Sequence, residues 1–160
     1  MAVAYIDRIT RHYEQLGYAP YRWYHADTAP PWTALRKPLD RLRLGMLSTA
    51  GAYVAGQRAF HYKDDTSLRE IAHDTPSDQI RFSHITEGYL AGPRRDPDCI
   101  LPLTALRQLV TDGMLGSLAE RALSCMGGIY SQRRVRAELI PAVATAFTAQ
   151  QVDAVLLVPM

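Results

Sequence analysis

The feature that most constrains the fold is an alternation of strand-like and helix-like segments in the second half of the chain. Short apolar runs are separated by longer segments in which leucine and valine recur at helical spacing. In chain order the expected elements are a strand over 80–85, a helix over 102–113, a strand over 121–126, a helix over 131–150 and a buried strand over 152–158. Alternation of this kind produces parallel strands joined by right-handed crossovers. The sequence therefore predicts an α/β fold, with three layers built around a mostly parallel, Rossmann-like sheet.

The beginning of the chain predicts two further parts. Apolar residues at helical spacing over 2–16 indicate an amphipathic helix packed on a core, and Gly17 is suited to end it. Residues 18–38 are rich in proline, which favours extended backbone, and contain the large aromatic residues Tyr18, Tyr21, Trp23, Tyr24 and Trp32. We interpret this segment as a strap over the domain surface. We expect the helix and strap to occupy residues 1–40, and an α/β domain that begins with a strand over 43–48 to occupy residues 41–160.

Composition excludes several classes of protein. The 160 residues are 48% hydrophobic and 21% charged, which fits a globular domain with a substantial core. A net charge of +2 is too small to predict nucleic-acid binding, and the cluster of Arg133, Arg134 and Arg136 is more typical of a solvated helix face. No apolar run reaches the roughly 20 residues that a membrane span needs. We therefore expect neither nucleic acid nor membrane as a partner.

The N-terminus and the cysteines suggest a cytoplasmic protein. Asp7 and Arg8 fall within the first turns of the chain, which is not the pattern of a signal peptide. Cys99 and Cys125 are far apart and belong to no Cys-x-x-Cys motif. Two free thiols in a reducing compartment are the simplest interpretation of this pattern.

Small and hydroxyl-bearing residues follow the predicted strands. Parallel sheets bind ligands beyond the carboxyl ends of their strands. Backbone N–H groups in such loops can face an anion, so we predict a substrate site from residues in two loops. These residues are Ser48, Thr49, Gly51, Gly127 and Gly128. The spacing matches neither a dinucleotide fingerprint nor a phosphate-binding loop, so no cofactor is predicted.

Three nearby residues carry side chains that could take part in chemistry. His84 stands near the end of the predicted strand 80–85, where it is a candidate acid or base, although a hydrogen-bonded structural histidine is the favoured interpretation. Tyr130 follows the Gly127-Gly128 pair and is a second candidate for proton transfer. Cys125 adjoins the same loop, where it could be a reactive thiol or a buried apolar residue.

A metal site is a weaker alternative. His61, Asp64, Asp65 and His73 lie within one polar segment and carry the side chains that bind metals. Their spacing matches no recognised ligand motif, so we predict no metal site.

Several short stretches, taken in order, resemble the selenoprotein B subunits of glycine, sarcosine, betaine and D-proline reductases, and the resemblance spans most of the chain. The stretches are Tyr18-Ala19-Pro20-Tyr21-Arg22-Trp23, Lys37-Pro38-Leu39, Leu47-Ser48-Thr49-Ala50-Gly51, Leu68-Arg69-Glu70-Ile71, Arg95-Asp96-Pro97-Asp98-Cys99-Ile100-Leu101-Pro102, Leu115-Gly116-Ser117-Leu118, Met126-Gly127-Gly128-Ile129-Tyr130 and Val152-Asp153-Ala154-Val155-Leu156-Leu157-Val158-Pro159. One departure is Ala50-Gly51, where the family has two glycines.

The resemblance implies a reductase in which a selenol or thiol cleaves a small amine or related substrate and a disulfide is formed. In the family the last strand is followed at once by selenocysteine or cysteine. We therefore expect that residue directly after Met160, and a chain truncated at a UGA codon, with no catalytic nucleophile within the 160 residues. The resemblance further implies that Cys125 could act as a resolving thiol. The implied partners are a small-molecule substrate, a thiol–disulfide reductant such as a thioredoxin-like protein, and other reductase subunits. The alternative left open is a short, non-catalytic paralogue that binds a small anion or forms a complex.

Overall fold

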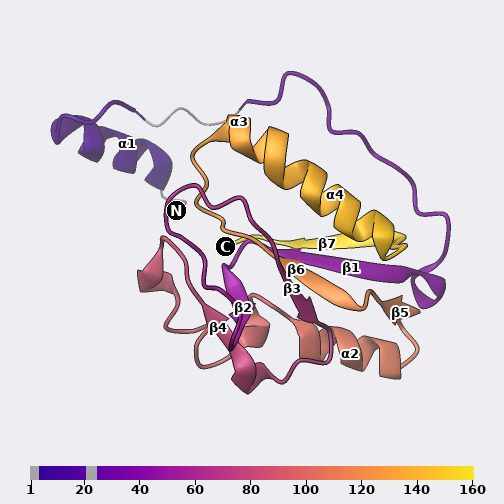
Figure 1. Cartoon of the computed structure of the whole chain (residues 1–160). Coiled ribbons are helices and arrows are strands. Elements are labelled where there is room, and N and C mark those ends of the chain that lie inside the picture. Colours follow the sequence, from indigo (N-terminus) through magenta and orange to yellow (C-terminus); the bar gives the residue numbers. More distant parts are fainter. Residues whose placement is uncertain (1–3, 21–24) are drawn as a thin grey trace. The chain divides into compact units, whose positions relative to one another are not determined.

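The computed structural model describes residues 4–20 and 25–160 (Figure 1). The chain forms two compact units, Met1–Ala34 and Leu35–Met160. Every strand among the described residues belongs to the second unit. The predicted strap residues Tyr21, Trp23 and Tyr24 lie outside the described residues.

The first unit contains one helix, α1 (Tyr5–Gln15). Gly17 follows it with a φ of +84°, which glycine adopts without strain, so the predicted helix and its end are confirmed. The apolar stripe of α1, which includes Ile9 and Tyr13, has no partner within the first unit that buries it. The packing of this helix on a core and the covering role of the strap stay predictions.

Strand β1 (Arg43–Ser48) is the centre of the main sheet in the second unit. It pairs in parallel with β5 (Ser117–Leu118), β6 (Arg121–Ser124) and β7 (Ala154–Val158). The predicted strands over 43–48, 121–126 and 152–158 are therefore confirmed, along with the mostly parallel α/β fold. Because the three longer strands are parallel, their carboxyl ends meet at one edge of the sheet.

The burial predicted for the last strand is wrong. Strand β7 has β1 as its pairing partner, and Leu157 remains 66% exposed. An edge strand of this kind presents apolar side chains and unpaired backbone groups to solvent.

Two antiparallel pairings complete the strands. Strand β3 (Arg69–Ala72) extends the main sheet beside β6. Strand β2 (Ala52–Val54) pairs with β4 (Ile80–Phe82) in a separate two-stranded sheet. The strand predicted over 80–85 is thus shorter than expected and lies outside the parallel sheet. Its predicted inward side is correct, since Ile80, Phe82 and His84 are all buried.

The helices of the second unit lie on both sides of the main sheet (Figure 1). Helix α2 (Leu103–Thr111) and the β2–β4 pair lie on one side and enclose the main hydrophobic core, with Leu103 and Leu106 buried. The opposite side is covered by a continuous helical segment formed by α3 (Gln132–Arg134), the π-helix Val135–Leu139 and α4 (Ile140–Ala149). The short 3₁₀ helices are Leu39–Arg41, Ser77–Gln79, Glu87–Tyr89 and Pro97–Cys99.

The long helical segment sits close to the sheet because β1 contains a glycine. A Cβ atom at Gly45 would lie 2.7 Å from the ring of Phe147, which is buried. The π-helix ends at Leu139, two residues before Pro141. Proline cannot donate the backbone hydrogen bond that a regular helix requires, which accounts for the irregular turn.

Candidate functional site

The carboxyl ends of β1, β6 and β7 meet at the edge of the sheet where the sequence predicts a substrate site. Ser48 and Ser124 end their strands with no exposed surface. The Ser48 hydroxyl donates to the Ile100 carbonyl at 2.7 Å, and Ser124 Oγ accepts from the Ala52 N–H at 2.8 Å. Both hydroxyls therefore hold the loops that surround the strand ends.

Thr49 joins β1 to the end of β7. Its backbone N–H donates to the Val158 carbonyl at 3.0 Å, and its Oγ1 accepts from the Met160 N–H at 2.9 Å. These two hydrogen bonds hold the backbone that follows β7 beside the end of β1.

Gly51 makes the turn after β1 possible. Its φ is +62°, and a Cβ atom there would lie 2.2 Å from the Ser83 carbonyl oxygen. Its N–H donates to the Cys125 carbonyl at 2.9 Å, while its carbonyl accepts from the Ser83 N–H at 3.0 Å. Glycine is therefore required both by backbone conformation and by the close approach of the chain. The turn links β1, β6 and the segment that carries His84.

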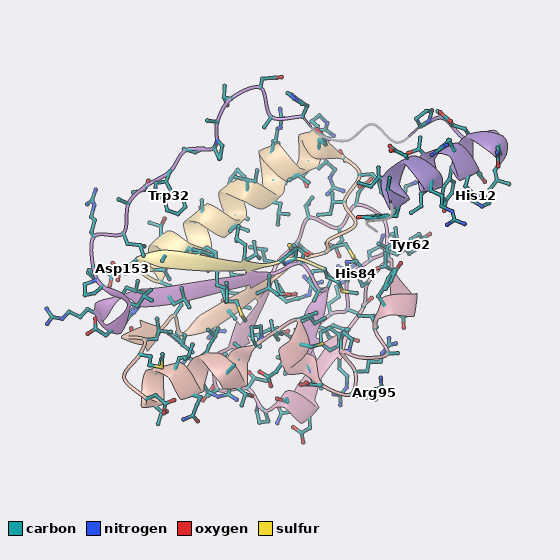
Figure 2. The ribbon with its side chains drawn as sticks, turned by 180° about the vertical axis from the view of Figure 1, so that it is seen from behind. His12, Trp32, Tyr62, His84, Arg95 and Asp153 are labelled. Carbon is teal, nitrogen blue, oxygen red and sulfur yellow. The ribbon has the colours of Figure 1, made fainter. Side chains whose placement is uncertain are left out.

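His84 lies beside the strand ends with 7% of its surface exposed (Figure 2). Its Nδ1 accepts from the Thr86 N–H at 3.1 Å and lies 2.6 Å from Thr86 Oγ1. Its Nε2 lies 3.2 Å from the Gly127 N–H. Burial lowers the pKa of His84, although a hydrogen bond with the Thr49 backbone and the charge of Glu87 oppose this. The ring thus connects three loops, and both of its nitrogens are engaged by the protein.

The loop after β6 packs closely against His84. A Cβ atom at Gly127 would lie 2.9 Å from both His84 Nε2 and the Thr49 carbonyl oxygen. At Gly128 it would lie 2.2 Å from a methyl group of Ile85. Tyr130 ends the loop with 70% of its surface exposed. The phenol is thus accessible, in contrast to the His84 ring.

The two cysteines differ sharply. Cys125 is buried, with 1% of its surface exposed, and burial raises the pKa of its thiol to about 11. Its thiol is therefore protonated at neutral pH and shielded from solvent in this conformation. Cys99 is exposed and lies in the 3₁₀ helix Pro97–Cys99.

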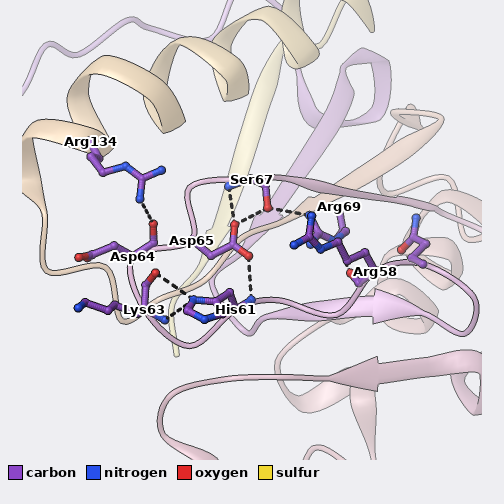
Figure 3. A pocket seen from close by; sticks show the side chains of 9 residues that line it. Arg58, His61, Lys63, Asp64, Asp65, Ser67, Arg69 and Arg134 are labelled. Atoms are coloured by element: carbon purple, nitrogen blue, oxygen red, sulfur yellow. Dashed lines mark hydrogen bonds between the residues drawn. The ribbon is translucent and has the colours of Figure 1, made fainter.

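The acidic residues of the alternative metal site hold backbone instead. Asp64 Oδ1 accepts from the N–H groups of Tyr130 and Ser131, at 2.8 and 3.0 Å. Asp65 accepts from the N–H groups of His61 and Ser67 (Figure 3). Across residues 4–20 and 25–160, no three His, Cys, Asp or Glu side chains are grouped so that they could hold a metal ion.

The structure therefore brings the predicted substrate-binding residues into one neighbourhood. Backbone contacts connect Thr49, Gly51, His84 and Gly127 around the strand ends. Sequence reasoning missed a cavity that is lined by the segment 57–69 and by Arg134. The polar segment was visible in the sequence, but the approach of Arg134, from the start of a distant helix, was not.

Comparison with known proteins gives one informative relative. The D-proline reductase subunit gamma of Acetoanaerobium sticklandii is 31% identical over 132 residues, which cover 81% of this chain and 54% of that protein. The chain thus spans about half the length of the curated relative it matches. This similarity supports a relation between the chain and that reductase.

The remaining comparisons add no family. No family model matches the chain, and no solved structure matches it. In the described part of the chain, no helix is long and apolar enough to cross a membrane.

Proposed function

We propose that this chain is the scaffold of a selenol- or thiol-dependent reductase domain, in which reductive cleavage of a small amine or related substrate is coupled to disulfide formation. The observation that carries the proposal is the position of Met160. Its backbone is held by Thr49 at the carboxyl ends of three parallel strands. The similarity to D-proline reductase subunit gamma supports the same function.

In this proposal the nucleophile is a selenocysteine or cysteine directly after Met160. Cys125 is poorly suited to that role, because its thiol is buried and protonated. A residue placed next in the chain would instead follow the backbone that Thr49 holds at the strand ends. Backbone N–H groups of the loops there would favour an anionic selenolate or thiolate.

The remaining site residues have distinct proposed roles. Ser48, Thr49 and Gly51 shape the substrate-binding loop, and their backbone contacts keep it in place. Tyr130 is the better placed proton donor because its side chain is exposed. His84 positions the loops and would exchange a proton only if one of its nitrogens became free.

The proposed partners follow from this chemistry. Reductive cleavage consumes two electrons, which a dithiol supplies when it becomes a disulfide. A thioredoxin-like protein is a suitable cytoplasmic donor, and the name of the relative suggests assembly with other reductase subunits.

The proposal is tested by extending the reading frame beyond Met160. The codon that follows Met160 should be UGA or a cysteine codon, followed by an open frame. The protein produced from that frame should oxidise a dithiol in the presence of D-proline, glycine, sarcosine or betaine. Replacement of the added selenocysteine or cysteine by serine should abolish turnover. A different stop codon without an open frame, or equal turnover by the serine variant, would refute the proposal.

A second candidate is a non-catalytic subunit of a reductase complex. It is favoured by the apolar side chains of β7, since Leu156 and Leu157 are 37% and 66% exposed at the edge of the sheet. Association with a partner subunit in the absence of dithiol turnover would favour this candidate over the enzyme.

A further inference from the structure

A cationic cavity is formed by a loop and a helix start of the second unit. It has a volume of about 580 Å³, and its lining comes from residues 57–69 and from Arg134 at the start of the long helical segment (Figure 3). A cavity of this size can hold a small molecule or ion. The question is which charge it selects.

The carboxylates of this cavity are already committed to the protein. Asp64 Oδ1 accepts two backbone N–H groups at the start of the helix. Asp65 accepts backbone N–H groups through both of its oxygens, at 2.8 and 2.9 Å, and its pKa is lowered even though burial opposes the shift. Their negative charge is therefore balanced by loop and helix backbone rather than directed at a ligand.

Two cations of the cavity are not committed in this way. Within residues 4–20 and 25–160, neither the Arg58 guanidinium nor the Lys63 ammonium forms a hydrogen bond or ion pair. His61 Nδ1 lies 3.2 Å from the Lys63 N–H and 3.3 Å from the Lys63 carbonyl oxygen, and its Nε2 has no partner among these residues. Arg58 and Lys63 can therefore bind an anion without breaking an existing hydrogen bond or ion pair.

Two further arginines form a fixed frame around them. The Arg69 guanidinium donates to the carbonyls of Arg58 and Ala59 and lies 4.3 Å from the centre of the Phe60 ring. Arg134 donates to the Asp64 carbonyl and forms an ion pair with Glu138. The loop that carries Arg58 and Lys63 is therefore held by hydrogen bonds to Arg69 at one place and to Arg134 at another. Such a frame limits the ordering entropy that ligand binding would cost.

We propose that this cavity binds a small oxyanion, such as a carboxylate or a phosphate group. The charge of Arg134 is balanced by its ion pair with Glu138. The other lining cations, which are Arg58, Lys63 and Arg69, outnumber the lining carboxylates Asp64 and Asp65. The two carboxylates are held by backbone, so a bound anion would face the unpartnered donors. The lining of this cavity includes none of the strand-end residues Thr49, Gly51, His84 and Gly127. The proposal therefore does not depend on the proposed reductase activity.

The test is a titration of the purified chain with sodium phosphate and, separately, with sodium acetate, at constant ionic strength. Calorimetry and thermal unfolding should both detect saturable binding by at least one anion, and the stronger arm identifies a phosphate or a carboxylate as the preferred group. Arg58→Gln and Lys63→Gln should each weaken that binding about tenfold, as expected when a charged hydrogen bond is lost.

Arg95→Gln is the matched control, because Arg95 is exposed and lies outside the cavity lining. It removes the same charge and should leave the affinity unchanged. Circular dichroism should show that all three variants fold, since the side chains of Arg58 and Lys63 form no hydrogen bond or ion pair with the described residues. The proposal is overturned if neither anion binds saturably, or if Arg95→Gln weakens binding as much as the cavity variants do.

Discussion

The backbone N–H of Met160 donates a hydrogen bond to Oγ1 of Thr49 at 2.9 Å. Thr49→Val keeps the β-branched shape but removes the acceptor. Since Met160 is only partly exposed, its N–H is incompletely compensated by water. We expect a loss of about 1 kcal/mol in the free energy of unfolding, measured by urea denaturation.

The control for this prediction is Thr148→Val. Thr148 is exposed on α4, and its hydroxyl makes no hydrogen bond among the described residues. It should change the free energy of unfolding by much less. Equal effects of the two substitutions would show that the contact between Thr49 and Met160 contributes nothing measurable.

Gly51→Ala should be far more damaging than its size suggests. The new Cβ would approach the Ser83 carbonyl oxygen to 2.2 Å, and the φ of +62° is unfavourable for alanine. We expect at least about 2 kcal/mol of destabilisation, measured by chemical unfolding. Gly92→Ala is a matched control, because a Cβ there would meet nothing within 4 Å. Similar stability of the two variants would contradict the close packing of this turn.

Local patterns predicted the strands well because each is a short apolar run with a clear end. The predicted strand over 43–48 matches β1 residue for residue. Pattern alone failed for β7, whose composition resembles a buried strand although Leu157 is 66% exposed. Whether a strand is central or at an edge depends on pairing with distant segments, which composition does not encode.

The same limit applies to the candidate site. Gly51 was identifiable because a glycine after a strand has a local conformational reason. The hydrogen bond between His84 and Gly127 joins residues 43 positions apart, so sequence could place His84 near a strand end without revealing that both nitrogens are occupied. The role of Asp64 at the start of a helix 66 or more residues away was likewise hidden.

Cys99 and Cys125 should react at very different rates with iodoacetamide. Cys99 is exposed, whereas the Cys125 thiol is buried and its pKa is raised to about 11. In the native protein at pH 8 we expect Cys125 to be alkylated at least about tenfold more slowly than Cys99, because the thiolate is the reactive form. Peptide mass spectrometry measures the two sites separately, and denaturation in urea should make them react alike. Rapid native labelling of Cys125 would instead support its role as an accessible resolving thiol.

His84 should make stability depend on pH in a defined window. Burial lowers its folded-state pKa below the usual 6.5, so the unfolded chain takes up the proton first as the pH falls. The stabilisation is complete above 6.5 and is lost as the pH falls toward the lowered folded-state pKa. Protonation of Glu138 affects stability only at lower pH, because hydrogen bonds from Arg134 and Thr66 lower its pKa from the usual 4.5 to about 2.

The measurement is the free energy of unfolding of the wild type and of His84→Gln between about pH 8 and pH 5. Glutamine cannot be protonated in this range, so the difference in stability between the two proteins should shrink as the pH falls below 6.5. His12→Gln, which alters an exposed residue on α1, should follow the wild-type profile. A difference between wild type and His84→Gln that stays constant across this range would show that His84 titrates alike in the folded and unfolded chain.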